Sequence, residues 1–195
     1  MYGLLDAVKS TGYILRRKMT MKNLLLFIFL LLVFFLLFSL LSLIRYFIIV
    51  FIVLISILLG ALSTMYQRIT VIPLGVDLVV FVTVLNGVAY GSFVGALVGF
   101  CSYFLGQVLT ARFNHTTFVS LPAITFLGIL AGLFSEVSIA PLGFTLTVVF
   151  DAIVIPIYLF LGSDWFKSAV FVVGHIAVNY WLFYHLAGII LEVMV

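Results

Sequence analysis

The run from Leu24 to Ile44 is almost wholly apolar and carries no charged residue, and it constrains the fold more than any other feature. About 20 consecutive apolar residues are enough for a helix that crosses a bilayer. A transmembrane barrel requires alternating segments of about ten residues, whereas this run is continuous. It also exceeds the roughly 7–15 apolar residues of a signal peptide, and no small-x-small cleavage site directly follows it. We therefore predict a retained transmembrane helix over 24–44.

The rest of the chain is also strongly apolar. Hydrophobic residues make up 66% of the sequence and charged residues 8%, whereas soluble domains have about 45–50% and about 25%. This composition excludes a water-soluble globule, a disordered chain and a nucleic-acid-binding module. We predict an all-α integral membrane protein that crosses the cell membrane several times. Its surroundings are the lipid bilayer, and it has no nucleic-acid partner.

The basic residues are concentrated before the first apolar run. Five of the nine lie in a polar tail over 1–22, namely Lys9, Arg16, Arg17, Lys18 and Lys22. Lys and Arg near the ends of spans favour the cytoplasmic side of a membrane. We predict this basic tail, followed by a single transmembrane domain over 23–195. That domain consists of an extra helix, 24–44, and a core bundle, 46–194.

Arg45 separates the first apolar run from a second one over 46–65. One helix through both runs would be about 60 Å long, twice the hydrocarbon thickness of a bilayer. We therefore predict a break near 42–46. Further spans are expected over 77–90, 91–110, 118–134, 142–161 and 168–194. The alternative is that residues 24–66 cross the membrane only once.

Small residues recur at every fourth position in three places. The longest stripe consists of Gly87, Gly91, Gly95 and Gly99, and a shorter one of Gly128 and Gly132. Such faces let membrane helices approach closely, so we assign both stripes to helix packing, with a sliding or hinge surface as the alternative. The third face is Ser56, Gly60 and Thr64. It either packs inside the bundle or docks a partner subunit.

Polar residues within the predicted spans indicate a ligand site. Ionisable groups at membrane depth are expensive, and they usually face a cavity or a partner. Asp151 lies near the middle of its span, and His175 and Asn179 share one helix face because they are four residues apart. We predict a substrate-binding set of Asn86, Asp151, His175 and Asn179, with Asp77 and Tyr90 behind them. The alternative is a buried hydrogen-bonded network that joins helices, in which Asp77 caps the helix that follows it.

The sequence has no enzyme signature. The segment from Gly91 to Gly95 places its serine directly after the first glycine, unlike a nucleophile elbow. There is no phosphate-binding loop and no H-E-x-x-H motif. The three histidines are dispersed, and the single cysteine, Cys101, excludes an intramolecular disulfide and a cysteine-based zinc site. We expect no catalysis, no metal and no cofactor.

From Tyr46 onward the order of features resembles a known family. A helix with a small-residue face leads into a loop with Pro73 and Gly75, followed by a short span and the segment Tyr90–Gly99. A later helix carries the Gly128 and Gly132 pair, and the last one contains Asn179. This pattern resembles the substrate-binding S component of energy-coupling factor (ECF) transporters. The resemblance covers residues 46–194, and Tyr90–Gly99 is its most specific part.

The resemblance implies a six-helix bundle, here with an additional N-terminal transmembrane helix. It implies uptake of a vitamin or other micronutrient, bound near the outer face under the loop after the first helix, here 66–76. It also implies partners, namely a coupling transmembrane subunit and two ATPases that supply ATP hydrolysis. Ser56, Gly60 and Thr64 take the place of the family's small-residue docking face.

A different class of protein has a similar size and pattern. A membrane scaffold similar to the rod-shape-determining MreD proteins, or another subunit of a larger membrane complex, needs no ligand pocket. Such a protein should tolerate the loss of Asp151 and Asn179, but it should fail when the glycine stripe is widened by Gly91→Leu.

Overall fold

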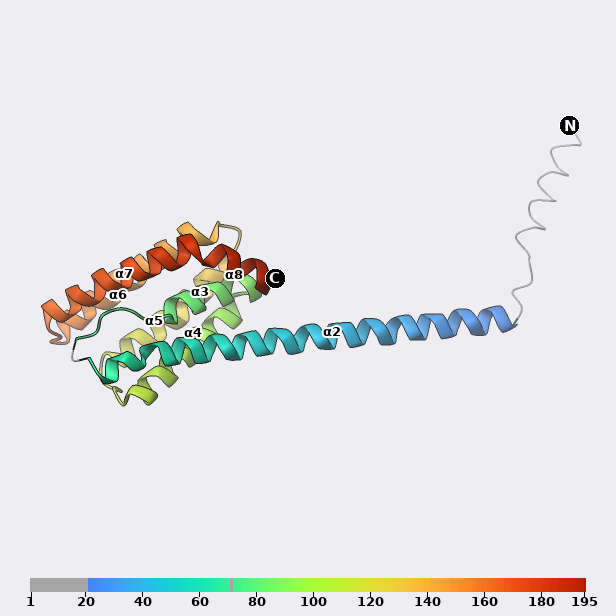
Figure 1. The fold of residues 1–195 in the computed structure, drawn as a ribbon, viewed down its shortest axis with the longest axis horizontal. Helices are drawn as coiled ribbons and strands as arrows, with labels where there is room; N and C mark the ends of the chain where they lie inside the picture. Colours follow the sequence, from blue (N-terminus) through green and yellow to red (C-terminus); the bar gives the residue numbers. More distant parts are fainter. Residues whose placement is uncertain (1–20, 71) are drawn as a thin grey trace, which may run out of the picture. The chain divides into compact units, whose positions relative to one another are not determined.

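A computed structural model describes residues 21–70 and 72–195 of the chain, with side chains from Leu25 onward. Every regular element in this part of the chain is a helix (Figure 1). The chain divides into two compact units, Met1–Ile48 and Ile49–Val195. The predicted basic tail lies outside the described residues, apart from the two residues that begin the first described helix.

The helix α2 runs from Met21 to Ser63 and belongs to both units. The break that the sequence predicts near 42–46 is therefore wrong, because α2 continues through Arg45. No proline occurs in α2, and its first glycine is Gly60. The hydroxyl of Ser42 donates to the Phe38 carbonyl of the same helix at 2.9 Å. Nothing in the local sequence therefore ends the helix before its last turn.

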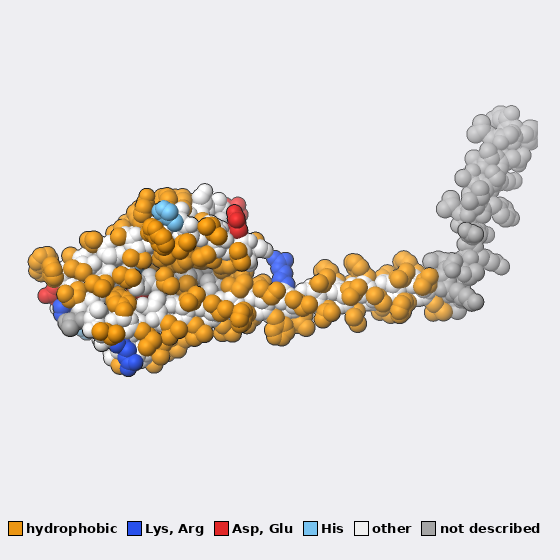
Figure 2. Space-filling model, viewed as in Figure 1, with side chains coloured by type: hydrophobic (Ala, Val, Ile, Leu, Met, Phe, Trp, Pro, Cys, Tyr) orange, Lys and Arg blue, Asp and Glu red, His pale blue; other side chains and the backbone are white. Residues whose placement is uncertain are grey.

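The described part of the first unit, residues 25–48, exposes apolar side chains in all directions (Figure 2). A helix that is apolar all round is suited to lipid or to the centre of a larger assembly. In the described residues, four helical stretches are long and apolar enough to cross a membrane: Leu25–Arg68, Ser92–Thr110, Ile139–Phe160 and Trp165–His185. The shorter helices Val79–Tyr90 and Thr117–Leu133 are also apolar. The fold is therefore compatible with a membrane protein.

The second unit contains the end of α2 and the helices that follow it (Figure 1). After the short 3-10 helix η1 (Thr64–Arg68) come α3 (Val79–Tyr90), α4 (Ser92–Thr110), α5 (Thr117–Leu133), α6 (Ile139–Phe160), α7 (Trp165–His185) and α8 (Ala187–Met194). The predicted spans 77–90, 91–110, 118–134 and 142–161 correspond closely to α3–α6. The predicted span 168–194 is divided into α7 and α8.

The core of the second unit is built around α3. All residues from Val79 to Gly87 are buried, so this short helix is covered on every side. The ring of Phe81 packs on that of Phe183 in α7, with ring centroids 5.2 Å apart. This central position places the start of α3 next to the other helices at one end of the bundle, where the candidate site lies.

Glycines allow α3, α4 and α5 to pack backbone against backbone. A Cβ atom added to Gly95 in α4 would lie 2.6 Å from the Gly128 carbonyl oxygen in α5. One added to Gly87 in α3 would lie 2.9 Å from the same oxygen, and one on Gly132 would lie 2.2 Å from the Ser92 nitrogen. Larger residues therefore do not fit at these crossings without displacing a helix.

Gly91 has a different role from its neighbours in the stripe. It separates α3 from α4, with φ at 93° and ψ at 170°, and no other atom lies within 4 Å of an added Cβ. Its assignment to helix packing is therefore wrong. The residue makes a sharp change of direction in a backbone region that side chains disfavour.

The small face on α2 packs inside the second unit. A Cβ added to Gly60 would lie 2.8 Å from Cβ of Ser102 in α4, and one added to Gly106 would lie 2.7 Å from Oγ1 of Thr64. Ser56 and Thr64 are buried. The prediction that Ser56, Gly60 and Thr64 dock a partner is therefore wrong, because α4 already covers this face.

Candidate functional site

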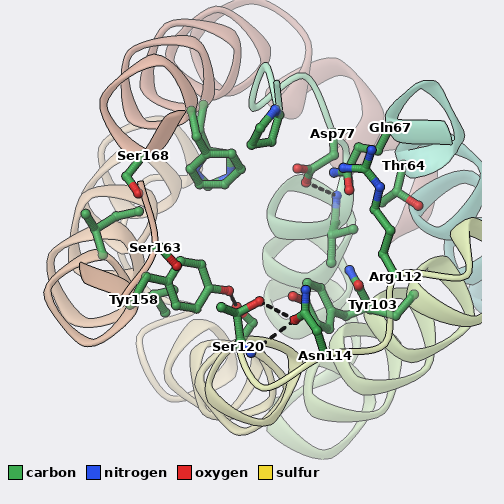
Figure 3. Close-up of a pocket in the computed structure, with 18 of the residues that line it drawn as sticks. Thr64, Gln67, Asp77, Tyr103, Arg112, Asn114, Ser120, Tyr158, Ser163 and Ser168 are labelled. Atoms are coloured by element: carbon green, nitrogen blue, oxygen red, sulfur yellow. Dashed lines mark hydrogen bonds between the residues drawn. The ribbon is translucent and has the colours of Figure 1, made fainter. Parts of the chain in front are cut away.

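A cavity of about 360 Å³ lies in the second unit, at the end of the bundle where α3, α5 and α7 begin. Figure 3 shows polar side chains pointing into it from several helices and from the segments between them. Its volume is within the range of about 300–1,000 Å³ that is usual for small-molecule sites. Three different connections between the longer helices border this cavity. They contribute residues 67 and 73 between α2 and α3, residue 114 between α4 and α5, and residues 163–164 between α6 and α7.

The inner wall of the cavity contains a hydrogen-bonded histidine and carboxylate. Nδ1 of His175 in α7 lies 2.9 Å from Oδ1 and 3.0 Å from Oδ2 of Asp151 in α6. Both side chains are buried, and His175 lines the cavity while Asp151 lies behind it. With Nδ1–H donating to the carboxylate, Nε2 is the ring nitrogen available to a ligand. The pair therefore fixes the orientation of the imidazole.

Asp77 lies just before α3 and lines the cavity. Its Oδ1 accepts a hydrogen bond from the Val79 backbone N–H at 3.3 Å, at the first residue of α3. Only 8% of Asp77 is exposed. Burial raises the pKa of the Asp77 carboxyl above its ordinary value, while the nearby His175 and the Val79 N–H act in the opposite direction. The position of Asp77 agrees with the prediction of a pocket-facing group, whereas the N-cap of α3 is Leu78 and Asp77 only accepts the N–H of the first helical residue.

Aromatic rings surround the imidazole. The ring of Phe171 stacks on His175 with centroids 5.0 Å apart and an angle of 20°, and the ring of Phe150 lies 5.9 Å from it. Tyr103 and Tyr158 line the cavity as well, and the Tyr158 hydroxyl is hydrogen-bonded to that of Ser120 (Figure 3). The cavity therefore combines flat apolar surfaces with hydroxyl groups, as expected of a site for a small organic molecule.

The segment 72–78 lies directly against α7. A Cβ added to Gly174 would be 1.9 Å from the Leu74 carbonyl oxygen, so only glycine permits this approach. On the other side of the contact, Gly75 has φ at 68°, and a Cβ there would lie 2.5 Å from the His175 nitrogen. These two glycines therefore hold the segment beside the same turn of α7 that carries His175.

The mouth of the cavity carries charged side chains. Lys167 and Asp164 at the start of α7 are exposed, and the carboxylate of Asp164 accepts the Lys167 backbone N–H at 2.9 Å. The guanidinium of Arg112 donates to the Thr70 carbonyl at 2.8 Å and so links two connections between helices.

The structure brings together only part of the predicted substrate-binding set. Asp77 and His175 line the cavity, and Asp151 contacts His175. Asn86 and Asn179 are fully buried and are not among the lining residues, and their side-chain amides donate to the carbonyls of Val82 and His175, one helical turn earlier. Their carboxamide oxygens have no hydrogen-bond partner in the described part of the chain.

Tyr90 lies apart from these residues. Its hydroxyl donates to the Met194 carbonyl at 3.0 Å, so it joins the last residue of α3 to the end of α8. The cavity instead borders the first turn of α3. The prediction that Tyr90 supports the ligand site is therefore wrong for this cavity, and its contact is a structural one.

Sequence reasoning missed several lining residues, notably Tyr103, Gln107, Ser120 and Tyr158. One signal was present for two of them. Tyr103 and Gln107 are four residues apart in α4, so they mark one polar face on an otherwise apolar helix. Ser120 and Tyr158 are isolated polar residues, and only the packing of α5 beside α6 brings them together.

Fold and site together define an all-helical protein, compatible with membrane insertion, with an internal cavity at one end of its helical bundle. Comparison of the chain with models of protein families, with curated proteins and with solved structures found no match. In the described residues, no group of three or more His, Cys, Asp or Glu side chains is arranged to hold a metal ion.

Proposed function

We propose that this chain is the substrate-binding transmembrane subunit of an ECF-type transporter that takes up a vitamin or other micronutrient across the cell membrane. The observation that carries the proposal is the cavity beside the segment 72–78, between the first and second helices of the second unit. The resemblance of residues 46–194 to S components implies a ligand site at this position. The cavity also contains Asp77 and His175 of the predicted substrate-binding set.

The continuity of α2 supports a topology suited to uptake. When α2 is counted as one crossing, a cytoplasmic basic tail puts the segment 72–78 on the outer side. The connections 111–116 and 161–164 then lie on the same side, because they border the same cavity. In this topology the cavity opens to the outside, and α7 returns the chain to the inside.

The proposal assigns ATP hydrolysis to partner subunits. The small-residue face of α2 is buried against α4, so docking on a coupling subunit must use another surface of the protein. The experiment that tests this is purification of the full chain in mild detergent, with mass spectrometry of the proteins that accompany it. Two ATPases and a membrane coupling subunit support the proposal. Envelope or respiratory subunits, or no partner, contradict it.

The scaffold alternative makes a different prediction for the cavity. A scaffold of the MreD-like class needs no ligand site, so variants of Asp77 or His175 that still fold should perform like wild type. A transporter subunit with the same substitutions should lose uptake and keep its partners. Uptake and partner retention measured on the same variants therefore separate the two functions.

A further inference from the structure

We propose that the cavity binds a small aromatic organic cation, with the positive group against Asp77 and the ring between the aromatic side chains of α4, α6 and α7. This inference rests on the proposed function, since it names the chemical class of the substrate for the same site.

The carboxylate of Asp77 is buried without a cation. One of its oxygens accepts the Val79 N–H, and the other has no hydrogen bond within the described residues. Among the described residues, the ion pair that forms joins His175 to Asp151. Asp77 is therefore not paired with a described Lys or Arg side chain. A buried carboxylate is expensive unless it is paired and hydrogen-bonded. A cationic ligand that donates to Asp77 would supply the missing partner.

His175 does not replace that cation. Its Nδ1 is within hydrogen-bonding distance of both oxygens of Asp151, so its positive charge, when present, is shared with a second carboxylate. Even with a protonated imidazole, the group of Asp77, Asp151 and His175 has one negative charge in excess. The inner wall therefore favours a ligand with one positive charge.

The other walls are suited to a flat cation. Tyr103, Phe150, Tyr158 and Phe171 all line the cavity. The faces of aromatic rings attract cations and stack on planar ligands. The hydroxyls of Tyr158 and Ser120 are hydrogen-bonded to each other. The ring of Tyr158 is therefore the main surface that this wall offers to a ligand.

Two basic side chains that line the cavity, Lys167 and Arg112, form no ion pair with its buried carboxylate. Lys167 is exposed at the mouth, and the Arg112 guanidinium is held by the Thr70 carbonyl. Neither is paired with Asp77. If these two basic side chains bound the ligand instead, the cavity would prefer an anion, and benzoate would bind most tightly in the experiment below.

The test uses the full chain, purified in detergent and reconstituted in nanodiscs, and three ligands of nearly the same shape. Benzamidine carries a positive charge at neutral pH, benzamide is neutral and benzoate is negative. Binding of each is measured by saturation-transfer NMR titration. Wild type is compared with Asp77→Asn, and with Glu136→Gln as the matched control, because Glu136 is an exposed carboxylate that does not line the cavity. Melting curves establish that both variants fold.

We expect wild type and Glu136→Gln to bind benzamidine at least about tenfold more tightly than benzamide or benzoate, because a charge-assisted hydrogen bond to a buried carboxylate is stronger than a neutral one. Folded Asp77→Asn should lose this preference and keep its affinity for benzamide. Equal binding of all three ligands, or a preference for benzoate, overturns the cation inference and leaves a ligand-binding cavity in place. Failure of all three to saturate overturns the cation inference, whereas the proposed function is decided by the proteins that accompany the chain on purification.

Discussion

Nδ1 of His175 lies within hydrogen-bonding distance of both carboxylate oxygens of Asp151, at 2.9 and 3.0 Å, and thereby joins α7 to α6 beside the cavity. Replacing either partner of a buried pair is destabilising, because the other partner then stays buried without its hydrogen bond and opposite charge. We therefore expect the losses of stability caused by substituting His175 and Asp151 to depend on each other.

Asp151→Asn and His175→Gln should each destabilise the protein, and the double variant should lose less than the sum of the two. The reason is that both substitutions remove the same contact, with a coupling of about 1–3 kcal/mol. Unfolding free energies from detergent denaturation in mixed micelles measure this. The control pair, Asp164→Asn with His115→Gln, involves two exposed side chains and should be additive. Additive losses in the Asp151 and His175 pair would show that the contact contributes nothing.

Gly174→Ala should displace the segment 72–78. The new Cβ would lie 1.9 Å from the Leu74 carbonyl oxygen, so either the segment or α7 has to move, at about 1–3 kcal/mol. We expect a lower melting temperature and faster proteolysis within the segment. Gly188→Ala is the matched control, because nothing lies within 4 Å of its added Cβ. Equal melting temperatures of the two variants would contradict the close contact.

The size of the introduced side chain should matter at Gly128 but not at Gly91. A Cβ at Gly128 meets the Gly95 backbone at 2.4 Å, so Ala should destabilise and Leu should destabilise further. At Gly91 the cost comes from a φ of 93° and not from a clash, so Ala and Leu should cost about the same, of order 1–3 kcal/mol. Melting temperatures of the four variants decide this. A larger loss with Gly91→Leu than with Gly91→Ala would restore Gly91 to the packing stripe.

The stability of the protein should depend on pH through Asp77. Burial raises its pKa above the ordinary value of 3.8, so folding favours the protonated form. A group whose pKa is raised by folding contributes stability at pH values below its pKa in the unfolded chain. This contribution is lost as the pH rises through its pKa in the folded protein. The melting temperature of wild type minus that of Asp77→Asn should therefore fall as the pH rises above 3.8. A difference that grows with pH would mean that the carboxylate is stabilised in the fold.

The proposed topology can be checked by cysteine labelling of intact cells. In a Cys101→Ser background, Ser163→Cys should react with a membrane-impermeant maleimide, because residue 163 borders the cavity proposed to open outward. Glu136→Cys, in the connection between α5 and α6, should react only after the cells are permeabilised. The reverse pattern would place the cavity on the cytoplasmic side and contradict uptake.

Much of the fold could be predicted from hydrophobic runs. The apolar segments between polar connections located α3–α6 closely, because chain segments of this length and composition have one stable secondary structure in lipid. The predicted break at Arg45 does not exist. A single charge does not end a helix, and α2 has no proline and no glycine before Gly60.

The site was only partly predictable, because helical periodicity fixes neighbours on one helix and not between helices. Asp151 and His175 stood out as ionisable residues in apolar spans, and they are in contact. Asn86 and Asn179 also stood out as polar residues in apolar spans, yet their side chains are buried in the packed interior and do not line the cavity. Tyr158 carried no sequence signal, since an aromatic residue near the end of a span is usually read as an interfacial anchor.

The contact between Gly174 and Leu74 has a thermodynamic consequence. One turn of α7 carries both the imidazole that faces the cavity and the glycine against which the segment 72–78 rests. A molecule that binds more tightly when this turn is in place also stabilises the segment in its present position. The segment in that position raises the affinity for the molecule by the same factor. Occupancy of the cavity is thereby linked to the position of the segment 72–78.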